Sequence, residues 1–385
     1  MHGRGTDGAS AVRHLVPLDG IRGLAVLIVI VHNAHWIAGE SGQFLLKLSG
    51  AIAASGWLGV QLFFVLSGFL ITGILLDAEG KERYFRSFYT RRALRIFPLY
   101  YAVLALVFLL GPLVAWSPGW MEAVRRNQWF YWLYVANWTE PFGRGIPGLA
   151  HFWSLAVEEQ FYLAWPLIVL LLSRRGLVAL CASLMLVTPF IRLGLRVGGF
   201  PPEAAYMFTV ARWDALAAGA LVACLVRSAP GREWLARWRW ALAVVAGAML
   251  VILAVVHRGF HQDDLPVQLL GQTLCSVLSA VLIVYAVDQG PAAPRRLQGW
   301  LSWRGLLVLG KYSYAMYIFH FPIHQLLEPL VGDMVRGADT PWRMARLALY
   351  LVVVFGLTLL AAMASWRLIE KPFLDLKEKI APRPA

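Results

Sequence analysis

The sequence predicts an all-α fold, a polytopic membrane helix bundle with about ten transmembrane helices. Hydrophobic residues make up 59% of the 385 residues and charged residues only 15%, whereas a soluble domain usually carries about a quarter charged residues. Apolar runs of about 20 residues recur along the chain, and each is long enough to cross a hydrocarbon core about 30 Å thick.

Ten apolar runs are expected to span the membrane: residues 16–37, 57–76, 96–115, 152–172, 177–195, 207–226, 240–257, 267–287, 306–328 and 347–366. The first carries Asp19 and Arg22 near its start and is followed by no small-residue cleavage site, so we expect a retained helix rather than a signal peptide. Together the spans form a transmembrane domain over residues 1–376. Residues 377–385 form a short cytoplasmic tail, which is expected to be disordered.

The distribution of Lys and Arg predicts the orientation. Alternate loops carry 22 of these residues on one side and 9 on the other, out of 35, and such an excess marks the cytoplasmic side. Both termini are therefore expected in the cytoplasm. The net charge of +13 would favour nucleic acid on a soluble protein. Here loop topology accounts for it, and no nucleic-acid partner is expected.

Ionisable residues inside the apolar runs predict a polar cavity, because such groups are costly next to lipid. Asp19 and Arg22 are three residues apart and can pair on one helix face. Arg212 and Asp214 are two apart, so we expect them to have different partners. The pair Asp19 and Arg22 and the pair Arg212 and Asp214 each have either a structural role, holding helices together, or a functional one. The full set is Asp19, Arg22, His32, His35, Glu158, Glu159, Arg192, Arg212, Asp214 and His320.

The densest basic cluster, Arg91, Arg92 and Arg95, lies at the cytoplasmic mouth of the third predicted span. One interpretation is an anchor that fixes topology and contacts anionic membrane lipid. The other is a docking site for a polyphosphate such as the nucleotide end of coenzyme A, because the arginine fork binds phosphate in bidentate fashion.

Histidines are the candidate bases. His32 lies ten residues, or about 15 Å, beyond Arg22 along a helix, and a neutral imidazole there could accept a proton from a hydroxyl. The alternative is a hydrogen-bonded core histidine. His35 follows one turn later. His320 and His324 have the spacing of metal ligands, but no carboxylate adjoins them, so no metal site is expected.

Familiar nucleophile and phosphate-binding motifs are missing from the sequence. Ser67 is followed by Gly68 but has no evident His–Asp pair, so the sequence does not favour a serine nucleophile. The three cysteines lie in apolar runs without metal-ligand spacing and are interpreted as packing residues.

Seven segments, in order over nearly the whole chain, together resemble the acyltransferase-3 family. They are LDGIRGLAVLIVIVHN (18–33), GWLGVQLFFVLSGFLIT (56–72), RRALRIFPLYY (91–101), FWSLAVEEQFYLAWP (152–166), RWDALAAGA (212–220), YSYAMYIFHFPI (312–323) and SWRLIEKPF (365–373). The resemblance implies ten membrane helices, a cytoplasmic acyl-CoA donor (most often acetyl-CoA), and acylation of a carbohydrate or similar hydroxyl at the outer face.

The resemblance also implies site residues. The first-helix Arg and His of the family correspond to Arg22 and His32, the Arg-x-x-Arg motif to Arg92 and Arg95, and the acidic position of the fourth-helix motif to Glu158.

The sequence departs from the family pattern at two positions. Nine residues separate Arg22 from His32 where the family usually has ten, and Asn33 takes the usual His position. Either the helix bulges locally or the site is arranged differently. Gln61 stands where members often have Asp. No fused esterase-like domain is expected after the tenth span, so the chain resembles the stand-alone form.

The resulting hypothesis is an O-acyltransferase of the bacterial cytoplasmic (inner) membrane. Arg91, Arg92 and Arg95 would hold the acyl-CoA phosphates, with Arg22 beside the thioester. His32 would deprotonate the acceptor hydroxyl, and Glu158 would orient the base or a donor group.

A separate partner enzyme at the outer face is compatible with this hypothesis. The alternative is a transporter or flippase for a lipid-linked saccharide, which predicts inverted repeats; none is evident in the sequence. A non-catalytic scaffold has little use for buried charges.

Overall fold

The computed structural model describes residues 15–32, 55–110, 118–257, 260–291, 293–336 and 340–380. Within these ranges every regular element is a helix. The principal helices are α1 (Val16–His32), α4 (Trp57–Asp77), α5 (Tyr84–Ala105), α6 (Pro118–Trp132), α7 (Phe152–Leu171), α8 (Arg174–Val197), α10 (Trp213–Leu225), α11 (Ala229–Val256), α12 (Gln272–Val287), α14 (Arg304–Arg336), α15 (Thr340–Ser365) and α16 (Lys371–Ile380).

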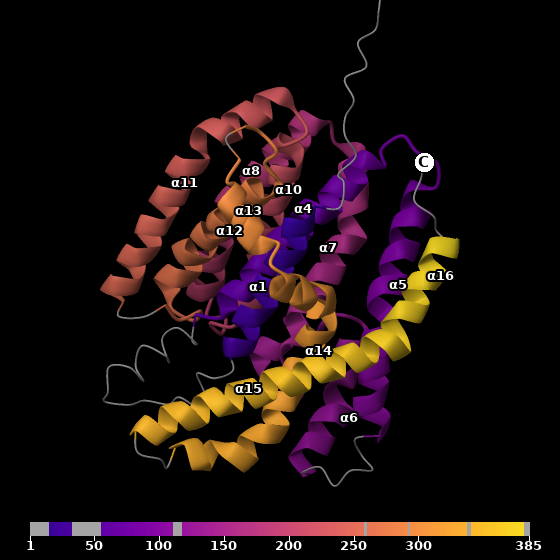
Figure 1. Cartoon of the computed structure of the whole chain (residues 1–385), viewed down its shortest axis with the longest axis vertical. Helices are drawn as coiled ribbons and strands as arrows, with labels where there is room; N and C mark the ends of the chain where they lie inside the picture. The colour runs from indigo at the N-terminus through magenta and orange to yellow at the C-terminus, as the bar shows by residue number, and fades with distance from the viewer. Residues whose placement is uncertain are drawn as a thin grey trace, which may run out of the picture.

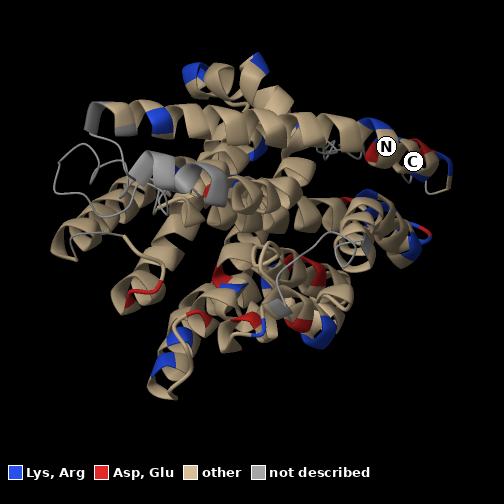
Figure 2. Ribbon diagram, turned by 90° about the horizontal axis from the view of Figure 1, so that it is seen from below, with Lys and Arg blue, Asp and Glu red and all other residues tan. Residues whose placement is uncertain are grey.

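The prediction of an all-α membrane bundle is confirmed. Seven helices among the described residues are long and apolar enough to cross a membrane, and the long helices carry their charged residues mainly near their ends (Figure 2). The other three predicted spans coincide with α1, α10 and α14. The described part of α1 has 17 residues and α10 has 13, so the count of ten and the location of the termini stay predictions.

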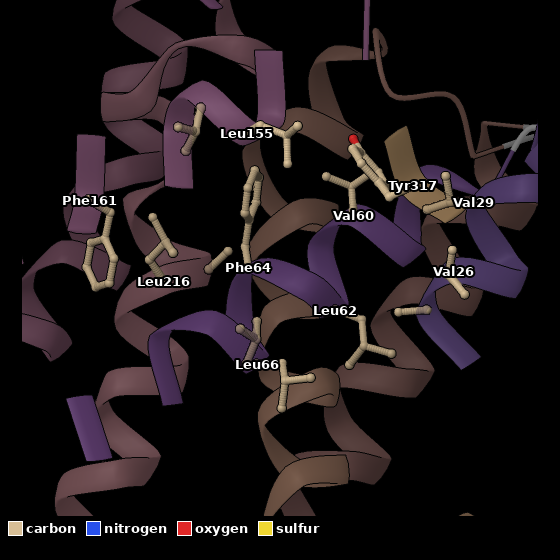
Figure 3. Close-up of a cluster of buried hydrophobic side chains, with 14 of the residues drawn as sticks. Val26, Val29, Val60, Leu62, Phe64, Leu66, Leu155, Phe161, Leu216 and Tyr317 are labelled. Atoms are coloured by element: carbon tan, nitrogen blue, oxygen red, sulfur yellow. The ribbon is translucent and has the colours of Figure 1, made fainter. Parts of the chain in front are cut away.

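Helix α4 forms the centre of the bundle and packs against α1, α7, α10 and α12. Most of its side chains are buried, in one core with Val26 and Val29 of α1, Leu155 of α7 and Leu216 of α10 (Figure 3). Because most of its surface is covered by other helices, although Ile74 is exposed, its apolar residues follow no single stripe.

Glycines allow α4 and α10 to approach closely. A Cβ atom at Gly68 of α4 would lie 2.0 Å from the carbonyl oxygen of Leu216, and one at Gly219 of α10 would lie 1.8 Å from that of Val65. Small residues at such crossings are a common device of membrane helix pairs, since they let backbones touch. This contact fixes the depth of α4 relative to α10.

The C-terminal helices α15 and α16 follow each other without a break. Helix α15 packs on α14, and the π-helical turn η7 (Trp366–Glu370) leads into α16, which lies beside α5 (Figure 1). Residues 377–380 are the last turn of α16, so this part of the predicted tail is ordered rather than disordered. Residues 381–385 lie outside the described residues.

Two element boundaries differ from those expected. The predicted span at 207–226 begins with a 3₁₀ turn, η5 (Thr209–Arg212), after the short helix α9 (Ala204–Met207), and becomes α-helical only at Trp213. The arginine-rich segment before the third span is helical from Tyr84, immediately after Arg83, whose φ is 59°. Arg91, Arg92 and Arg95 therefore lie on α5 itself, at positions fixed by the helix.

The remaining described elements are short connections: η1 (Leu106–Leu110), η3 (Ala136–Trp138), η4 (Glu140–Phe142), η6 (Val267–Gly271) and α13 (Arg295–Leu301). The Trp-rich connection before α7 folds as α6 followed by η3 and η4, and Trp129 and Trp138 remain exposed. Exposed tryptophans are typical of a segment that lies in the membrane–water interface.

Candidate active site

Three cavities follow one another through the bundle and share wall residues. The inner cavity, of about 420 Å³, lies between α1, α4 and α5. The middle cavity, of about 110 Å³, shares Arg22, Leu70, Arg92 and Arg95 with it. The outer cavity, of about 660 Å³, shares Val60 and Tyr317 with the middle one. The expected polar interior is thus present as a series of compartments.

The inner cavity gathers the predicted arginines. Arg91, Arg92 and Arg95 of α5 and Arg22 of α1 all line it, together with Lys81, Arg227 and Lys377. Acidic residues in its wall are fewer: Asp19, Asp77 and Glu82. The surplus of cations makes this compartment suited to a polyanion.

Individual contacts orient these arginines. Arg22 donates to Asp19 at 2.5 Å, which confirms the predicted pair. The guanidinium of Arg92 lies 5.4 Å from the centre of the Tyr162 ring. Arg91 forms an ion pair with Glu378 of α16 at 2.9 Å. The Arg92 guanidinium is therefore positioned over an aromatic ring, whereas Arg91 is paired with a carboxylate.

Glu158 lies in the middle cavity, on α7. Its carboxylate accepts a hydrogen bond from Ser67 of α4 at 2.6 Å, and Tyr162 donates to the same Ser67 oxygen at 3.1 Å. Glu159 lines this cavity as well. The structure thus places Glu158 beside the predicted arginines and Ser67, and in a different compartment from His32.

Tyr317 lies in the wall between the middle and outer cavities. The hydroxyl oxygen of Tyr317 lies 2.5 Å from Ser154 Oγ and 3.1 Å from the carbonyl oxygen of His151. These contacts hold the phenol ring of Tyr317 in the wall shared by both cavities.

Imidazoles define the outer cavity. His32 lines it together with His151, His320 and His324, and the aromatic walls are Trp57, Trp153, Tyr206 and Phe321. Because α1 is a regular α-helix from Val16 to His32, the proposed local bulge between Arg22 and His32 is absent from these residues. The site is arranged differently: Arg22 faces the two inner compartments and His32 the outer one. His35 lies outside the described residues.

Buried charged residues connect helices of the bundle next to the cavities. Asp214 pairs with Arg192 of α8 at 2.5 Å, and both side chains are fully buried. Arg212 instead donates to the amide oxygens of Gln61 and Gln272, which confirms that Arg212 and Asp214 have different partners. Gln61 therefore supplies a neutral acceptor to a buried guanidinium that also lies over the ring of Tyr206.

Sequence reasoning missed His151. His151 immediately precedes α7, outside any apolar run, and so it carried no signal of burial. Its position one residue before the segment FWSLAVEEQ could have drawn attention to it. In the described ranges, no group of three or more His, Cys, Asp or Glu residues could hold a metal ion.

The fold and the cavities define a multi-pass membrane protein with a cationic compartment at one end of an internal passage and imidazoles at the other. The family model described as an acyltransferase domain matches residues 16–367, and the chain belongs to this acyltransferase-3 family.

Three curated relatives are similar over most of the chain. The peptidoglycan O-acetyltransferase OatA of Listeria monocytogenes is 28% identical over 94% of this chain and 56% of its own length. The putative peptidoglycan O-acetyltransferase YrhL of Bacillus subtilis is 30% identical over 94% and 55%. The O-acetyltransferase OatA of Staphylococcus aureus is 28% identical over 94% and 57%. The chain thus spans little more than half the length of these relatives. No solved structure matches it.

Proposed function

We propose that this chain is a membrane O-acyltransferase that moves an acyl group, most simply acetyl, from cytoplasmic acyl-CoA to a carbohydrate hydroxyl at the outer face. The observation that supports this most directly is the series of three cavities, with arginines at one end and histidines at the other. The similarity to enzymes named for peptidoglycan O-acetylation makes a cell-wall glycan the first acceptor to test. The bacterial inner membrane is the corresponding location.

The donor would bind from the inner cavity. Arg91, Arg92 and Arg95 are placed to hold the phosphates of acyl-CoA, because guanidinium forks match phosphate oxygens in geometry and charge. Arg22 lies where the inner and middle cavities join, so it would contact the donor as its acyl arm enters the bundle.

The arm would then pass the middle cavity. Glu158 is expected to orient either the base or a donor group. Its hydrogen bond to Ser67, inside the compartment next to the arginines, favours the second role. Glu158 and Ser67 offer hydrogen-bonding groups to the polar part of the arm while it extends towards Tyr317.

Transfer would take place at the outer cavity. The acceptor oxygen attacks the thioester carbonyl carbon, its proton passes to His32, the C–S bond breaks, and the thiolate takes up a proton to leave as free thiol. Placing base, hydroxyl and thioester together removes most of the entropic barrier, and general-base help adds about 10²–10⁴-fold.

Thiol release tests this proposal. The protein, purified in lipid, is supplied with labelled acetyl-CoA and a panel of glycans that includes soluble peptidoglycan fragments. We expect glycan-dependent thiol release and label transfer, with both reduced at least 100-fold in His32→Ala and Arg92→Ala. Arg125→Ala is the matched control, because Arg125 is 76% exposed and lines none of the three cavities.

Two results would contradict the proposal. Full transfer by both His32→Ala and Arg92→Ala would disprove the site assignment. Movement of a lipid-linked saccharide across vesicles without any thiol release would identify a transporter instead.

A further inference from the structure

Two histidines of the outer cavity have a fixed ring nitrogen. His151 Nε2 lies 3.1 Å from the carbonyl oxygen of Ile318, and His320 Nδ1 lies 2.6 Å from the carbonyl oxygen of Tyr317. A carbonyl oxygen only accepts hydrogen bonds, so each of these nitrogens carries the proton. Two consecutive backbone carbonyls of α14 therefore fix the tautomers of both rings: His151 carries its proton on Nε2 and His320 on Nδ1.

The remaining nitrogen of each neutral ring is a bare acceptor. For His151 this is Nδ1, which is buried and has no hydrogen-bond partner among the described residues. For His320 it is Nε2. The two ring centres are 4.9 Å apart and the planes meet at 78°. Buried polar atoms in folded proteins are nearly always satisfied by protein or by ordered water, so the open acceptor of His151 marks a position for a hydrogen-bond donor, which a water or a ligand hydroxyl can supply.

The chemistry of the reaction partners favours one ligand. A thioester carbonyl and a phosphate only accept hydrogen bonds, and the arm of acyl-CoA offers separated amide N–H groups and a single hydroxyl, whereas a sugar ring presents several hydroxyls side by side. A sugar hydroxyl can donate. The rings of Trp57, Trp153 and Tyr206 in the same cavity offer apolar surfaces against which the C–H face of a sugar ring can pack.

We propose that His151 and His320 form an acceptor subsite that binds two hydroxyl groups of one sugar ring, one on each bare nitrogen, while His32 takes the proton of the attacking hydroxyl. This inference rests on the proposed function and adds the residues that bind the acceptor. It requires no charge on either ring, because a neutral imidazole with a fixed tautomer already offers the lone pair.

The test uses acceptors that lack one hydroxyl. Wild-type protein and the variants His151→Phe and His320→Phe are assayed in lipid with acetyl-CoA, peptidoglycan fragments and their monodeoxy analogues. Phenylalanine keeps the ring volume and removes the acceptor. We expect the acceptor KM to rise at least tenfold, with the donor KM unchanged within about twofold. We also expect each variant to lose the wild-type discrimination against one deoxy analogue.

Further variants separate binding from folding. His151→Gln and His320→Gln keep an amide donor for the carbonyl and an acceptor oxygen, so they should recover part of the acceptor affinity, even if the phenylalanine variants fail to fold. His261→Phe is the matched control, because His261 is exposed and lines none of the cavities.

Each outcome decides the matter. Either of two results would disprove the acceptor subsite without affecting the proposal of acyl transfer. One is an acceptor KM that stays unchanged in the phenylalanine variants. The other is an equal loss of acceptor affinity for every deoxy analogue in His151→Gln and His320→Gln. Absence of thiol release from wild-type protein with any acceptor would instead refute the proposed function.

Discussion

At the scale of single residues, the position of Arg92 requires the planar guanidinium group of arginine. Its guanidinium lies 5.4 Å and 6.0 Å from the ring centres of Tyr162 and Phe88 and faces two cavities. Lysine keeps the charge but loses the planar fork and the stacking surface. We expect Arg92→Lys to raise the donor KM about tenfold, or about 1.4 kcal/mol, with the acceptor KM unchanged.

Steady-state kinetics with acetyl-CoA as the varied substrate measures the effect of Arg92→Lys. Arg86→Lys is the control, since Arg86 lies on the same helix but is exposed and outside the cavities. Equal donor KM values for both variants would mean that Arg92 contributes only its charge.

Glu140, in the connection between α6 and α7, is predicted to make the stability of the protein depend on pH. Burial raises the pKa of this carboxyl from 4.5 to about 7, partly offset by a hydrogen bond from Tyr131. The folded protein therefore holds a proton that the unfolded chain releases, so this contribution to stability is complete below about pH 4.5 and is lost as the pH rises through about 7. Thermal unfolding between pH 5 and 8 should show this decline.

Glu140→Gln keeps an acceptor for Tyr131 and cannot ionise. Its unfolding temperature should fall less than that of the wild type between pH 5 and pH 8. A decline of the same size in both proteins would assign the pH dependence to other groups.

The sequence predicted the charged residues of the candidate site better than the uncharged ones. Arg22 and Glu158 stood out because charge inside an apolar run is costly. Arg91, Arg92 and Arg95 stood out as the densest basic cluster, and the structure gathers all five around two adjoining cavities. His151 carries no charge and lies outside the runs. Its importance arises from a contact with Ile318, 167 positions away, which no local pattern reports.

At the scale of helices, the contact between α4 and α10 depends on two glycines. Alanine normally stabilises a helix relative to glycine by about 0.5–1 kcal/mol. At Gly219, however, its Cβ would lie 1.8 Å from the Val65 carbonyl oxygen, so backbone must move, at a typical cost of about 1–3 kcal/mol for overpacking. Gly219→Ala should lower the unfolding temperature and weaken acyl transfer together.

Gly247→Ala in α11 is the matched substitution, because no atom lies within 4 Å of its added Cβ. It should leave both properties unchanged or raise stability slightly. If Gly219→Ala behaved in the same way, the two helices would have room to separate without loss.

The helical elements were predictable where an apolar run had clear ends, as in α4 and α7. They were less predictable where a helix carries polar residues of the candidate site. Arg91, Arg92 and Arg95 resemble a basic loop in composition, yet they lie on α5, because residues 84–95 contain neither glycine nor proline. Arg212, at the end of the 3₁₀ turn before α10, contacts Gln61 and Gln272. These residues belong to distant helices, so no local sequence pattern reports their arrangement.

At the scale of the whole molecule, the order of the cavities predicts that the two substrates enter from opposite faces. Among the described residues, the arginine-lined inner cavity and the histidine-lined outer cavity are joined by the small middle cavity, which shares Tyr317 with the outer one. A charged nucleotide cannot cross lipid, so it must approach from the arginine side. In sealed vesicles of one orientation, acetyl-CoA should support transfer only from that side and the glycan only from the other.

Measuring label transfer before and after permeabilising such vesicles tests this arrangement, because permeabilisation should make the side of addition irrelevant. Positive loops predict that the arginine side is cytoplasmic, so a fluorescent reporter on the C-terminus should face the donor compartment. Transfer with both substrates supplied on the glycan side of intact vesicles would show that the donor does not enter through the arginines. The inner cavity would then bind membrane lipid rather than acyl-CoA.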